Sequence, residues 1–340
     1  MLPGNESTPS YINFDSYAPA IITDSKGWIH IFNIPPTIDN ESIGYIRSKD
    51  GGETFEAAKQ IAFNIRGLEN LPEPNGWPMF PNGHFRTRTM VSACTGINQT
   101  LIIAWPDMRE GYCRIYYKTS TDGGETWLNT DSGVSLLPNV SWGNTQCFMP
   151  QLTATPNGTV GCTFYAFGKS PYNNDYLIDV YLAASYNNGN SFDHFTRVTN
   201  NGWNPLINAP FSHGDPNVGF IGDYFGIAGT DDFFIPFWTD TRTGVQEIFC
   251  DVVATKRTTD TTPEIVATFV SAGVMNDGGG IIIVNGKIIR VPPRSPEMKI
   301  LEGLSIIESS KSFEGRFAQG IRNAVVAALQ HEIGNLEKGY

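Results

Sequence analysis

One glycine-rich stretch of the chain gathers side chains suited to a polar site. The stretch FSHGDPNVGFIGDYFGIAG, residues 211–229, holds Asp215, Asp223 and Tyr224 just before an apolar strand-like segment. If it forms the inner strand of a sheet and the loop that feeds that strand, the three side chains face a central channel, where bundles of polar groups commonly make a site. The alternative is that Asp223 caps a turn and Tyr224 packs against its neighbours.

Two arginines have the spacing to hold an acidic group. Arg86 and Arg88 alternate with threonines in HFRTRTM, residues 84–90, so both lie on one face if the segment is a strand. A planar guanidinium meets a carboxylate with two parallel hydrogen bonds, which makes these arginines candidates for gripping an acidic ligand. The alternative for both is a solvated surface position.

Three turns of similar sequence show how the elements that carry these residues are organised. In each turn a serine, an aspartate or asparagine, a glycine and an aromatic keep their order: SKDGGETF (48–55), STDGGETW (120–127) and SYNNGNSF (185–192). Asp50 to Asp122 is 72 residues and Asp122 to Asn187 is 65, so the spacing is that of a repeat. The carboxylate of such a turn accepts backbone N–H bonds, the glycines take positive φ, and the aromatic folds back between sheets. We therefore expect Asp50, Asp122 and Asn187 to be structural.

A second marker supports the same repeat. Trp-x-Asp-x-Arg followed by an alternating strand occurs in AWPDMREGYCRIYYKTS, from residue 104, and in FWTDTRTGVQEIFCDVV, from residue 237. Trp105 and Trp238 lie 133 residues apart, about two periods, and a fourth, eroded turn is expected near 255–262, giving four units. Because Arg109 and Arg242 occupy the same place in two units, we expect each to pair with the aspartate two residues before it.

Each unit contains four strand-like runs. In the second unit they are TMVSAC, TLIIAW, CRIYYKTS and a short run that begins at WLNT. Four strands per unit are typical of a β-propeller blade, and radial repetition leaves only short sheet edges. A solenoid would have shorter strands and a shorter period. The sequence therefore predicts an all-β propeller of four to six blades over residues 1–260.

The last eighty residues differ in pattern. GGGIIIVNGKIIRVPP, residues 278–293, predicts a hairpin that turns at Asn285-Gly286. Two amphipathic helices are expected to follow, from Ser295 and from about Phe313. Residues 261–340 are therefore expected to form an appendage. Its helices pack on the side of the propeller or pair with another chain as a homo-oligomer, and an alternative is that the strands at 265–291 add a blade.

Composition limits the kinds of partner. The formal net charge of −11 argues against nucleic acid, which needs a basic surface. No apolar run approaches the roughly 18 residues of a membrane span, and the first residues lack the pattern of a signal peptide. The five cysteines lack the spacing of a metal site and are expected to be buried thiols. We expect no metal and no cofactor, and the compartment stays open, with secretion or the cell surface as alternatives.

The repeated turns resemble the Asp-box, or BNR repeat, whose pattern is Ser-x-Asp-x-Gly-x-Thr-Trp or Phe. The resemblance covers roughly residues 18–260, with two full matches and one partial match. The family includes sialidases and other glycoside hydrolases built on propellers, together with propellers that only bind. In it the turn joins the outer two strands of a blade on the side away from the ligand, which again makes Asp50 and Asp122 structural.

The resemblance also implies a kind of site. Sialidases of this family grip the sialate carboxylate with three arginines and use a tyrosine, activated by a glutamate, as nucleophile and an aspartate as acid/base. Arg86 and Arg88 are then the substrate-binding candidates, and the catalytic candidates are Asp215, Asp223 and Tyr224. The stretch FNIPP, residues 32–36, has Asn33 where the family's first arginine stands. Two functions follow: a sialidase-like glycoside hydrolase, or a noncatalytic propeller that binds a glycan or a protein.

Overall fold

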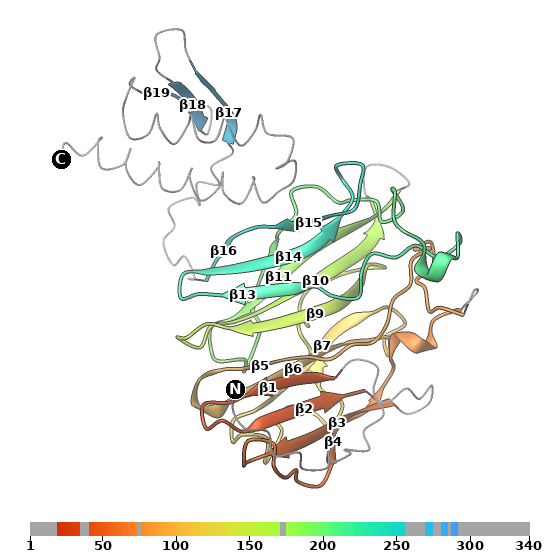
Figure 1. Ribbon diagram of the computed structural model, residues 1–340, viewed down its shortest axis with the longest axis vertical. Coiled ribbons are helices and arrows are strands. Elements are labelled where there is room, and N and C mark those ends of the chain that lie inside the picture. Colours follow the sequence, from red (N-terminus) through yellow and green to blue (C-terminus); the bar gives the residue numbers. More distant parts are fainter. Residues whose placement is uncertain are drawn as a thin grey trace, which may run out of the picture.

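The computed structural model describes residues 19–34, 41–73, 76–170, 175–255, 269–274, 280–284 and 287–291. These residues are almost entirely β-structure, and the first four sheets are each built from consecutive antiparallel strands (Figure 1). The first sheet comprises β1 (Ala20–Thr23), β2 (Ile29–Asn33), β3 (Glu41–Ser48) and β4 (Lys59–Ile65). The second comprises β5 (Ser92–Thr95), β6 (Leu101–Asp107), β7 (Arg114–Ser120) and β8 (Val134–Ser135).

The next two sheets follow the same order along the chain. The third comprises β9 (Gln146–Ala154), β10 (Val160–Lys169), β11 (Tyr176–Ser185) and β12 (His194–Arg197). The fourth comprises β13 (Gly226–Gly229), β14 (Phe233–Asp240), β15 (Glu247–Cys250) and β16 (Val253–Ala254), with both β15 and β16 paired to β14. Three four-stranded units are therefore confirmed. In the fourth sheet β15 and β16 follow one another along the same side of β14, so the described part of that sheet is three strands wide.

The sheets stack face to face because their middle strands are apolar on both sides. In β6, Leu101, Ile103 and Trp105 pack in the core shared with the first sheet, whereas Ile102 and Ala104 pack in the core shared with the third. Successive side chains of a strand point to opposite faces, so one strand supplies both cores. The buried apolar area on both faces holds the stack together.

The first strands of successive sheets line one side of the stack. β1 lies beside β5, β5 beside β9, and β9 beside β13. This is the order in which blades follow one another around an axis. The face of the fourth sheet that points away from the third exposes Phe233, Phe237 and Ile248 among the described residues. The first four sheets therefore form an arc of blade-like units.

The repeated turns share one hydrogen-bond pattern. In the second turn, Ser120 Oγ donates to Asp122 Oδ1 (2.8 Å) and accepts from Gly124 N (2.8 Å), while Thr126 donates its N–H to Asp122 Oδ1 (2.9 Å) and its hydroxyl to Oδ2 (2.5 Å). The equivalent atoms make the same bonds in the first turn, and Asn187 takes the place of the aspartate in the third. Asp50, Asp122 and Asn187 thus each close their own turn.

The second and third turns are also hydrogen-bonded to the preceding sheet, which gives a reason for the repeat. Tyr45 OH and Arg47 of the first sheet donate to Gly123 O of the second turn (3.4 and 2.6 Å). Tyr117 and Thr119 of the second sheet, at the equivalent positions, donate to the third turn, to Asn190 O (3.0 Å) and Gly189 O (2.8 Å). The aromatics that close these turns pack in the same interfaces, Trp127 against Phe32 and Tyr45, and Phe192 against Tyr117.

The third sheet lacks this polar fastening. Its equivalent positions are Leu182 and Ala184, whose side chains cannot donate a hydrogen bond. A turn of the same kind in the fourth unit would therefore receive no hydrogen bond from these two side chains of the third sheet. This agrees with the poor match of residues 255–262 to the repeated turn. The predicted turn at 255–262 lies outside the described residues after its first position.

A buried histidine at the interface of the first two sheets predicts a dependence of stability on pH. The His30 ring is fully buried, with Nδ1 2.8 Å from Tyr45 OH and Nε2 3.4 Å from Asp24 Oδ2. Burial lowers the pKa of His30 below 6.5, so the folded state holds the neutral ring. In the unfolded chain the His30 ring takes up a proton near pH 6.5, its ordinary pKa. Stability from this group is therefore present above pH 6.5 and is lost as the pH falls towards the folded-state pKa.

Urea denaturation of the wild type and of His30→Gln measures this effect. We expect the midpoint of the wild type to fall from about pH 7.5 to about pH 5.5 more than that of the variant. Equal slopes against pH in the two proteins would show that His30 does not carry the dependence.

One predicted strand is wrong. The fourth strand of the second sheet begins at Val134, not at Trp127. The reason is that Trp127 turns inward between sheets, and a turn in which Gly133 N bonds Thr130 O (2.9 Å) intervenes before the chain becomes extended.

The predicted C-terminal hairpin is confirmed. In the fifth sheet, β17 (Phe269–Val274) pairs with β18 (Gly280–Val284), and β18 pairs with β19 (Lys287–Val291). The turn residues Asn285 and Gly286 lie outside the described residues. So do the two helices expected from Ser295 and Phe313, and with them the predicted homo-oligomer contact.

Two further sequence expectations concern the cysteines and the membrane. All five cysteines are free thiols. Four of them are buried, as predicted, and Cys250 is half-buried. None of the helices in the described part of the chain has the length and apolarity that a membrane crossing requires.

Candidate functional site

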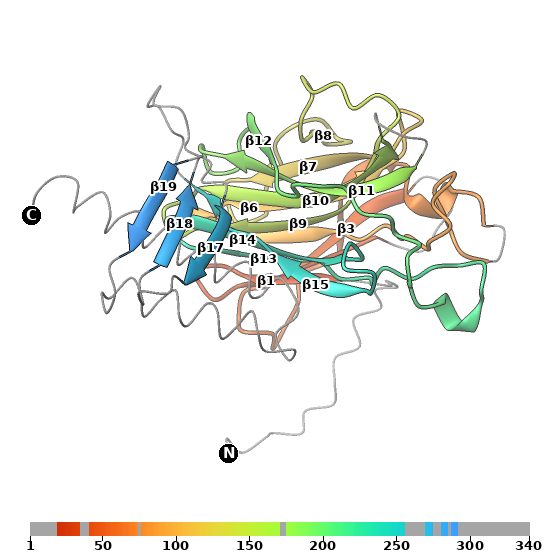
Figure 2. The ribbon, with the colours of Figure 1, turned by 90° about the horizontal axis from the view of Figure 1, so that it is seen from above.

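The polar candidates lie at the edge of the sheets opposite the repeated turns. Those turns follow the third strand of a sheet, so in an antiparallel sheet the loops after second strands, and the segments that join one sheet to the next, lie at the other edge. The short helices η1 (Leu68–Asn70) and η3 (Ser212–Gly214) belong to two of these joining segments and project from the same side in two views (Figures 1 and 2). We call this side the loop face.

Two joining segments meet on the loop face. The segment that leads into β5 contacts the segment that leads into β13, where Arg86 N donates to Gly219 O (3.0 Å) and Gly219 N donates to His84 O (2.7 Å). A Cβ on Gly219 would lie 3.1 Å from His84 O, so the close approach favours glycine there. Beneath this contact the Phe85 ring packs on Phe148 of β9 (5.8 Å between centroids). The aromatic core thus fixes the segments above it.

The structure brings Arg86 and Asp223 together. Arg86 Nη2 pairs with Asp223 Oδ2, although the two residues are 137 positions apart in the sequence. The Arg86 guanidinium also lies over the Phe220 ring (4.2 Å) and the Trp77 ring (4.8 Å). Arg88 lies over the same Trp77 ring (5.1 Å). Both candidate arginines are therefore gathered around one indole, beside a carboxylate that is 30% exposed.

The other two candidates are placed differently. The Asp215 carboxylate accepts from the backbone and the side chain of Asn217 (2.9 and 3.1 Å), so it closes its own turn. Tyr224, next to Asp223, is 86% exposed. Asp223 and Tyr224 thus share the open part of the loop face, while Asp215 has a local partner.

The two Trp-x-Asp-x-Arg motifs form matching ion pairs, as predicted. Asp107 accepts from Trp105 Nε1 (3.2 Å) and Arg109 N (2.9 Å) and pairs with the Arg109 side chain. The same three bonds link Trp238, Asp240 and Arg242 in the fourth sheet. Both aspartates are fully buried. Arg109 is therefore held by its own sheet, whereas Arg242 also donates to Asn200 Oδ1 (2.6 Å) in the segment after β12.

A tyrosine and glutamate pair that sequence reasoning missed also lies on this side of the second sheet. Tyr116 OH donates to Glu110, and the Arg109 guanidinium lies 4.1 Å from the centroid of the Tyr116 ring. Tyr116 is buried, and that burial, followed by the hydrogen bond to Glu110, raises its pKa. Its phenol therefore keeps its proton. No motif marks this pair, because the two residues meet only through the β6–β7 turn.

A cavity adjoins the contact between the two joining segments. It has a volume of about 310 Å³ and is lined by His84, Leu206, Phe211, Asn217 and Gly219 among others. In the described segments, no three side chains of His, Cys, Asp or Glu gather as a metal site needs. The polar features of the loop face are thus ion pairs, aromatic rings and backbone groups.

No protein-family model and no curated protein match the chain. Among solved structures, it is similar to an α-L-arabinofuranosidase from Fusarium graminearum, at 15% identity and a TM-score of 0.39 over 70% of this chain and 77% of that one. It is also similar to a Penicillium chrysogenum α-L-arabinanase complexed with arabinobiose (14%, TM-score 0.40, 79% and 72%) and to a Hadza microbial sialidase (12%, TM-score 0.40, 68% and 43%). At these identities and TM-scores, the likeness assigns neither a family nor an activity to this chain.

Proposed function

We propose that the chain is an Asp-box propeller that recognises a glycan on its loop face. The observation that carries this proposal is the gathering of Arg86 and Arg88 around Trp77, with Asp223 beside them, where two joining segments meet. An indole offers an apolar face to the C–H groups of a sugar ring, and the guanidinium groups donate to its hydroxyl or carboxylate oxygens. Trp77 and Arg88 are half-buried, so each keeps surface for a ligand.

The proposal includes the organisation of the chain. Residues 1–260 form the propeller, and residues 261–340 form an appendage. The arc of four sheets supports the first part, and the separate strand order of β17, β18 and β19 supports the second. The exposed apolar face of the fourth sheet is where a further blade would stack.

Hydrolysis is the second candidate, favoured by the exposure of Tyr224 beside Asp223. A sialidase of the resembling family uses three convergent arginines. Here Arg86 is paired with Asp223, and Arg109 and Arg242 are held by buried aspartates. The position of the family's first arginine is Asn33, which is buried. Because these three arginines are already paired with aspartates, the face fits ligand binding better than sialidase-type hydrolysis.

A glycan array followed by titration of the best ligand tests the proposal. We expect Arg88→Ala to raise the Kd about tenfold or more, because it removes charged hydrogen bonds to the ligand. Lys26→Ala, on the side of the repeated turns, is the matched control and should bind as the wild type does. A Kd unchanged by Arg88→Ala and by Arg86→Ala would refute a ligand site at Trp77.

A panel of fluorogenic sialosides and other aryl glycosides separates the two candidates. Turnover that Tyr224→Phe or Asp223→Asn abolishes would establish a glycosidase on this face. We expect no turnover by the wild type at high protein concentration.

A further inference from the structure

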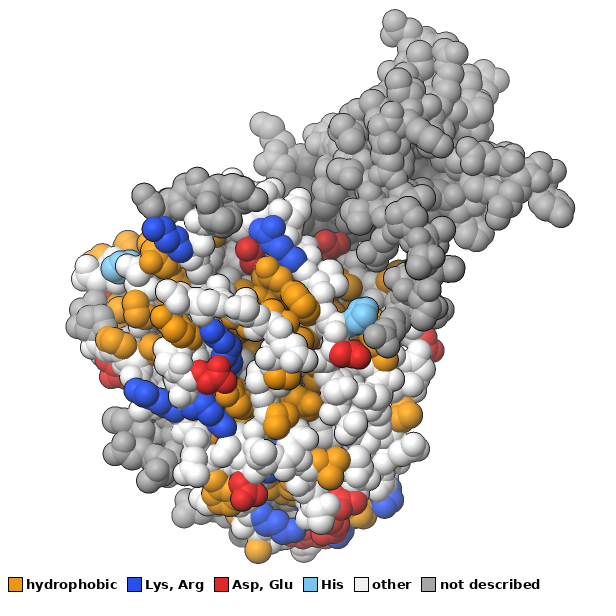
Figure 3. Space-filling view, turned by 180° about the vertical axis from the view of Figure 1, so that it is seen from behind, with side chains coloured by type: hydrophobic (Ala, Val, Ile, Leu, Met, Phe, Trp, Pro, Cys, Tyr) orange, Lys and Arg blue, Asp and Glu red, His pale blue; other side chains and the backbone are white. Residues whose placement is uncertain are grey.

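A second polar groove lies on the outer strands of the third sheet. Its volume is about 790 Å³, larger than that of the cavity on the loop face. It is lined by β11, β12, the end of β10 and the segment around Trp142. Figure 3 views the molecule from the side of the outer strands, where hydrophobic side chains are interspersed with Lys and Arg. We call the groove lined by these segments the outer groove.

One wall of the outer groove is aromatic. The Trp142 ring meets Tyr181 edge-on (5.1 Å between centroids) and Phe195 at 6.1 Å. Phe195 belongs to the outer strand β12 and is 45% exposed, so its ring is accessible to a ligand. Rings held by one another present a fixed apolar surface at little entropic cost.

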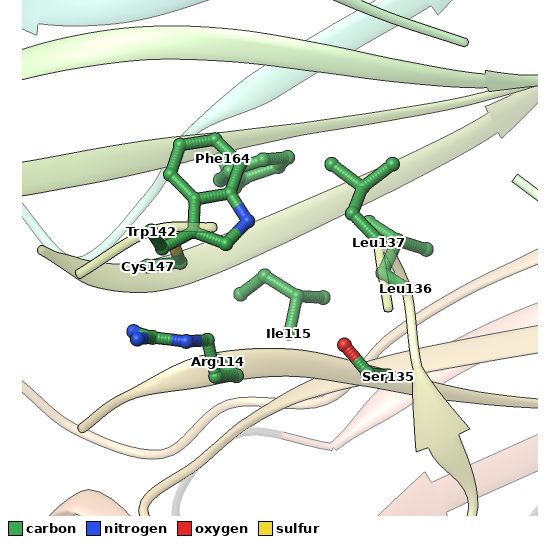
Figure 4. Close-up of a pocket in the computed structure, with 8 residues that line it drawn as sticks. All are labelled: Arg114, Ile115, Ser135, Leu136, Leu137, Trp142, Cys147 and Phe164. Atoms are coloured by element: carbon green, nitrogen blue, oxygen red, sulfur yellow. The ribbon is translucent and has the colours of Figure 1, made fainter. Parts of the chain in front are cut away.

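Trp142 is fixed from behind as well. Figure 4 shows its indole closing the narrow gap between the second and third sheets, over Cys147 and in front of Phe164. The Trp142 and Phe164 rings meet at 5.8 Å between centroids. Because the same side chain lines this gap and the outer groove, the packing of two sheets positions it. The aromatic wall is therefore preformed.

The floor of the groove carries an ordered ion pair. Asp179 Oδ1 accepts from Arg197 Nε (3.1 Å), Arg197 Nη2 (2.7 Å) and Thr199 Oγ1 (2.7 Å). All three bonds use one oxygen of the carboxylate, and both side chains line the groove and are partly exposed. A carboxylate that accepts and a guanidinium that donates thus lie together in the groove, and such groups bind hydroxyl groups.

The charge of the groove differs in sign from that of the whole chain. Lys169 and Arg197 line it with one acidic residue, Asp179, so its formal charge is 2 − 1 = +1, whereas the chain carries −11. Asn200 and Asn201 add amide groups at the rim. A fixed aromatic wall, a paired donor and acceptor, and a local positive charge together fit a sugar chain that bears carboxylates.

We propose that the outer groove binds an acidic oligosaccharide, with a sugar ring against Phe195 and Trp142 and a carboxylate near Arg197 and Lys169. The site is separate from Trp77 on the loop face and does not depend on the function proposed for that face. The alternative ligand is an extended peptide added to β12, the last strand of the third sheet among the described residues; it would bind mainly through backbone groups and would not distinguish the two probes below.

Isothermal titration calorimetry with tetragalacturonate and neutral cellotetraose as probes tests this inference. We expect tetragalacturonate to bind and cellotetraose to bind at least about tenfold more weakly, and the affinity for tetragalacturonate to fall as salt rises. Phe195→Ala and Arg197→Gln should each raise the Kd about tenfold or more. Both side chains are well exposed, so these variants keep the fold, which a thermal melt checks.

Arg88→Ala is the control that separates the two sites. It should leave the binding of tetragalacturonate unchanged, even if it abolishes the binding of a loop-face ligand. The inference is overturned if neither probe binds, if Phe195→Ala and Arg197→Gln bind as the wild type does, or if Arg88→Ala alone removes binding. Equal affinity for the two probes would overturn the assignment of an acidic sugar.

Discussion

Asp107→Ala should lower the free energy of unfolding by about 3–5 kcal/mol, which is the usual cost of removing one partner of a buried ion pair. Asp107 is fully buried, and besides the pair with Arg109 it accepts from Trp105 Nε1 (3.2 Å), Arg109 N (2.9 Å) and Arg66 N (3.3 Å). Alanine leaves these donors without an acceptor, and an unsatisfied buried donor costs free energy by itself. Urea denaturation at neutral pH measures the change.

Two further variants show whether the loss comes from the motif. Asp240→Ala removes the equivalent carboxylate in the fourth sheet and should destabilise by a similar amount, because the same bonds join Trp238 and Arg242 to it. Asp107→Asn keeps an acceptor oxygen but removes the charge, so it should fall between the wild type and Asp107→Ala. A loss below about 1 kcal/mol for Asp107→Ala would mean that water or a rearranged arginine replaces the carboxylate.

The features that the sequence predicted are those made by residues near one another in the chain. The hydrogen bonds of each repeated turn lie within eight residues, and Asp107 and Asp240 each pair with an arginine two positions later. The sequence pattern alone therefore predicts which residues are in contact. The units followed from the spacing of the repeated turns and from the strand-like runs between them. The predicted position of the fourth strand of the second sheet was wrong because Trp127 is a residue type common in strands. In the structure it ends the repeated turn, and its ring packs between the first two sheets.

The candidate sites depend on contacts that the sequence does not encode locally. Arg86 meets Asp223 only because two joining segments cross on the loop face, where Gly219 allows their backbones to approach. The outer groove could not be predicted for the same reason. Trp142 precedes the first strand of the third sheet and Arg197 ends its last strand, yet both line the groove. Local patterns named Arg86 and Asp223 as candidates, but only the stacking of the sheets shows which partner each one has.

The side of the repeated turns and the loop face each contain an ion pair that joins two segments distant in the sequence. On the side of the turns, charged groups are used to join one sheet to the next, as Arg47 joins Gly123 and Glu125. On the loop face, the ion pair of Arg86 and Asp223 stays partly open to solvent.

Arg47→Met should lower the free energy of unfolding by about 2–3 kcal/mol, below the usual cost of breaking a buried ion pair because both glutamate partners are partly exposed. Arg47 is 1% exposed, and it donates to Gly123 O (2.6 Å), Glu125 (2.7 Å) and Glu56 (2.7 and 3.1 Å). Methionine fills much of the same volume, so the variant removes the hydrogen bonds and the charge with little loss of packing.

Lys49→Met is the matched control for this variant. Lys49 contacts the same two glutamates, Glu56 at 2.9 Å and Glu125 at 3.1 Å, but its side chain is exposed and reaches no backbone carbonyl of the second turn. Its loss should therefore change stability far less than the loss of Arg47, and the difference should persist in high salt, which screens exposed pairs. If the two variants are equally stable, surface charge and not the buried bond to Gly123 fastens the second turn to the first sheet.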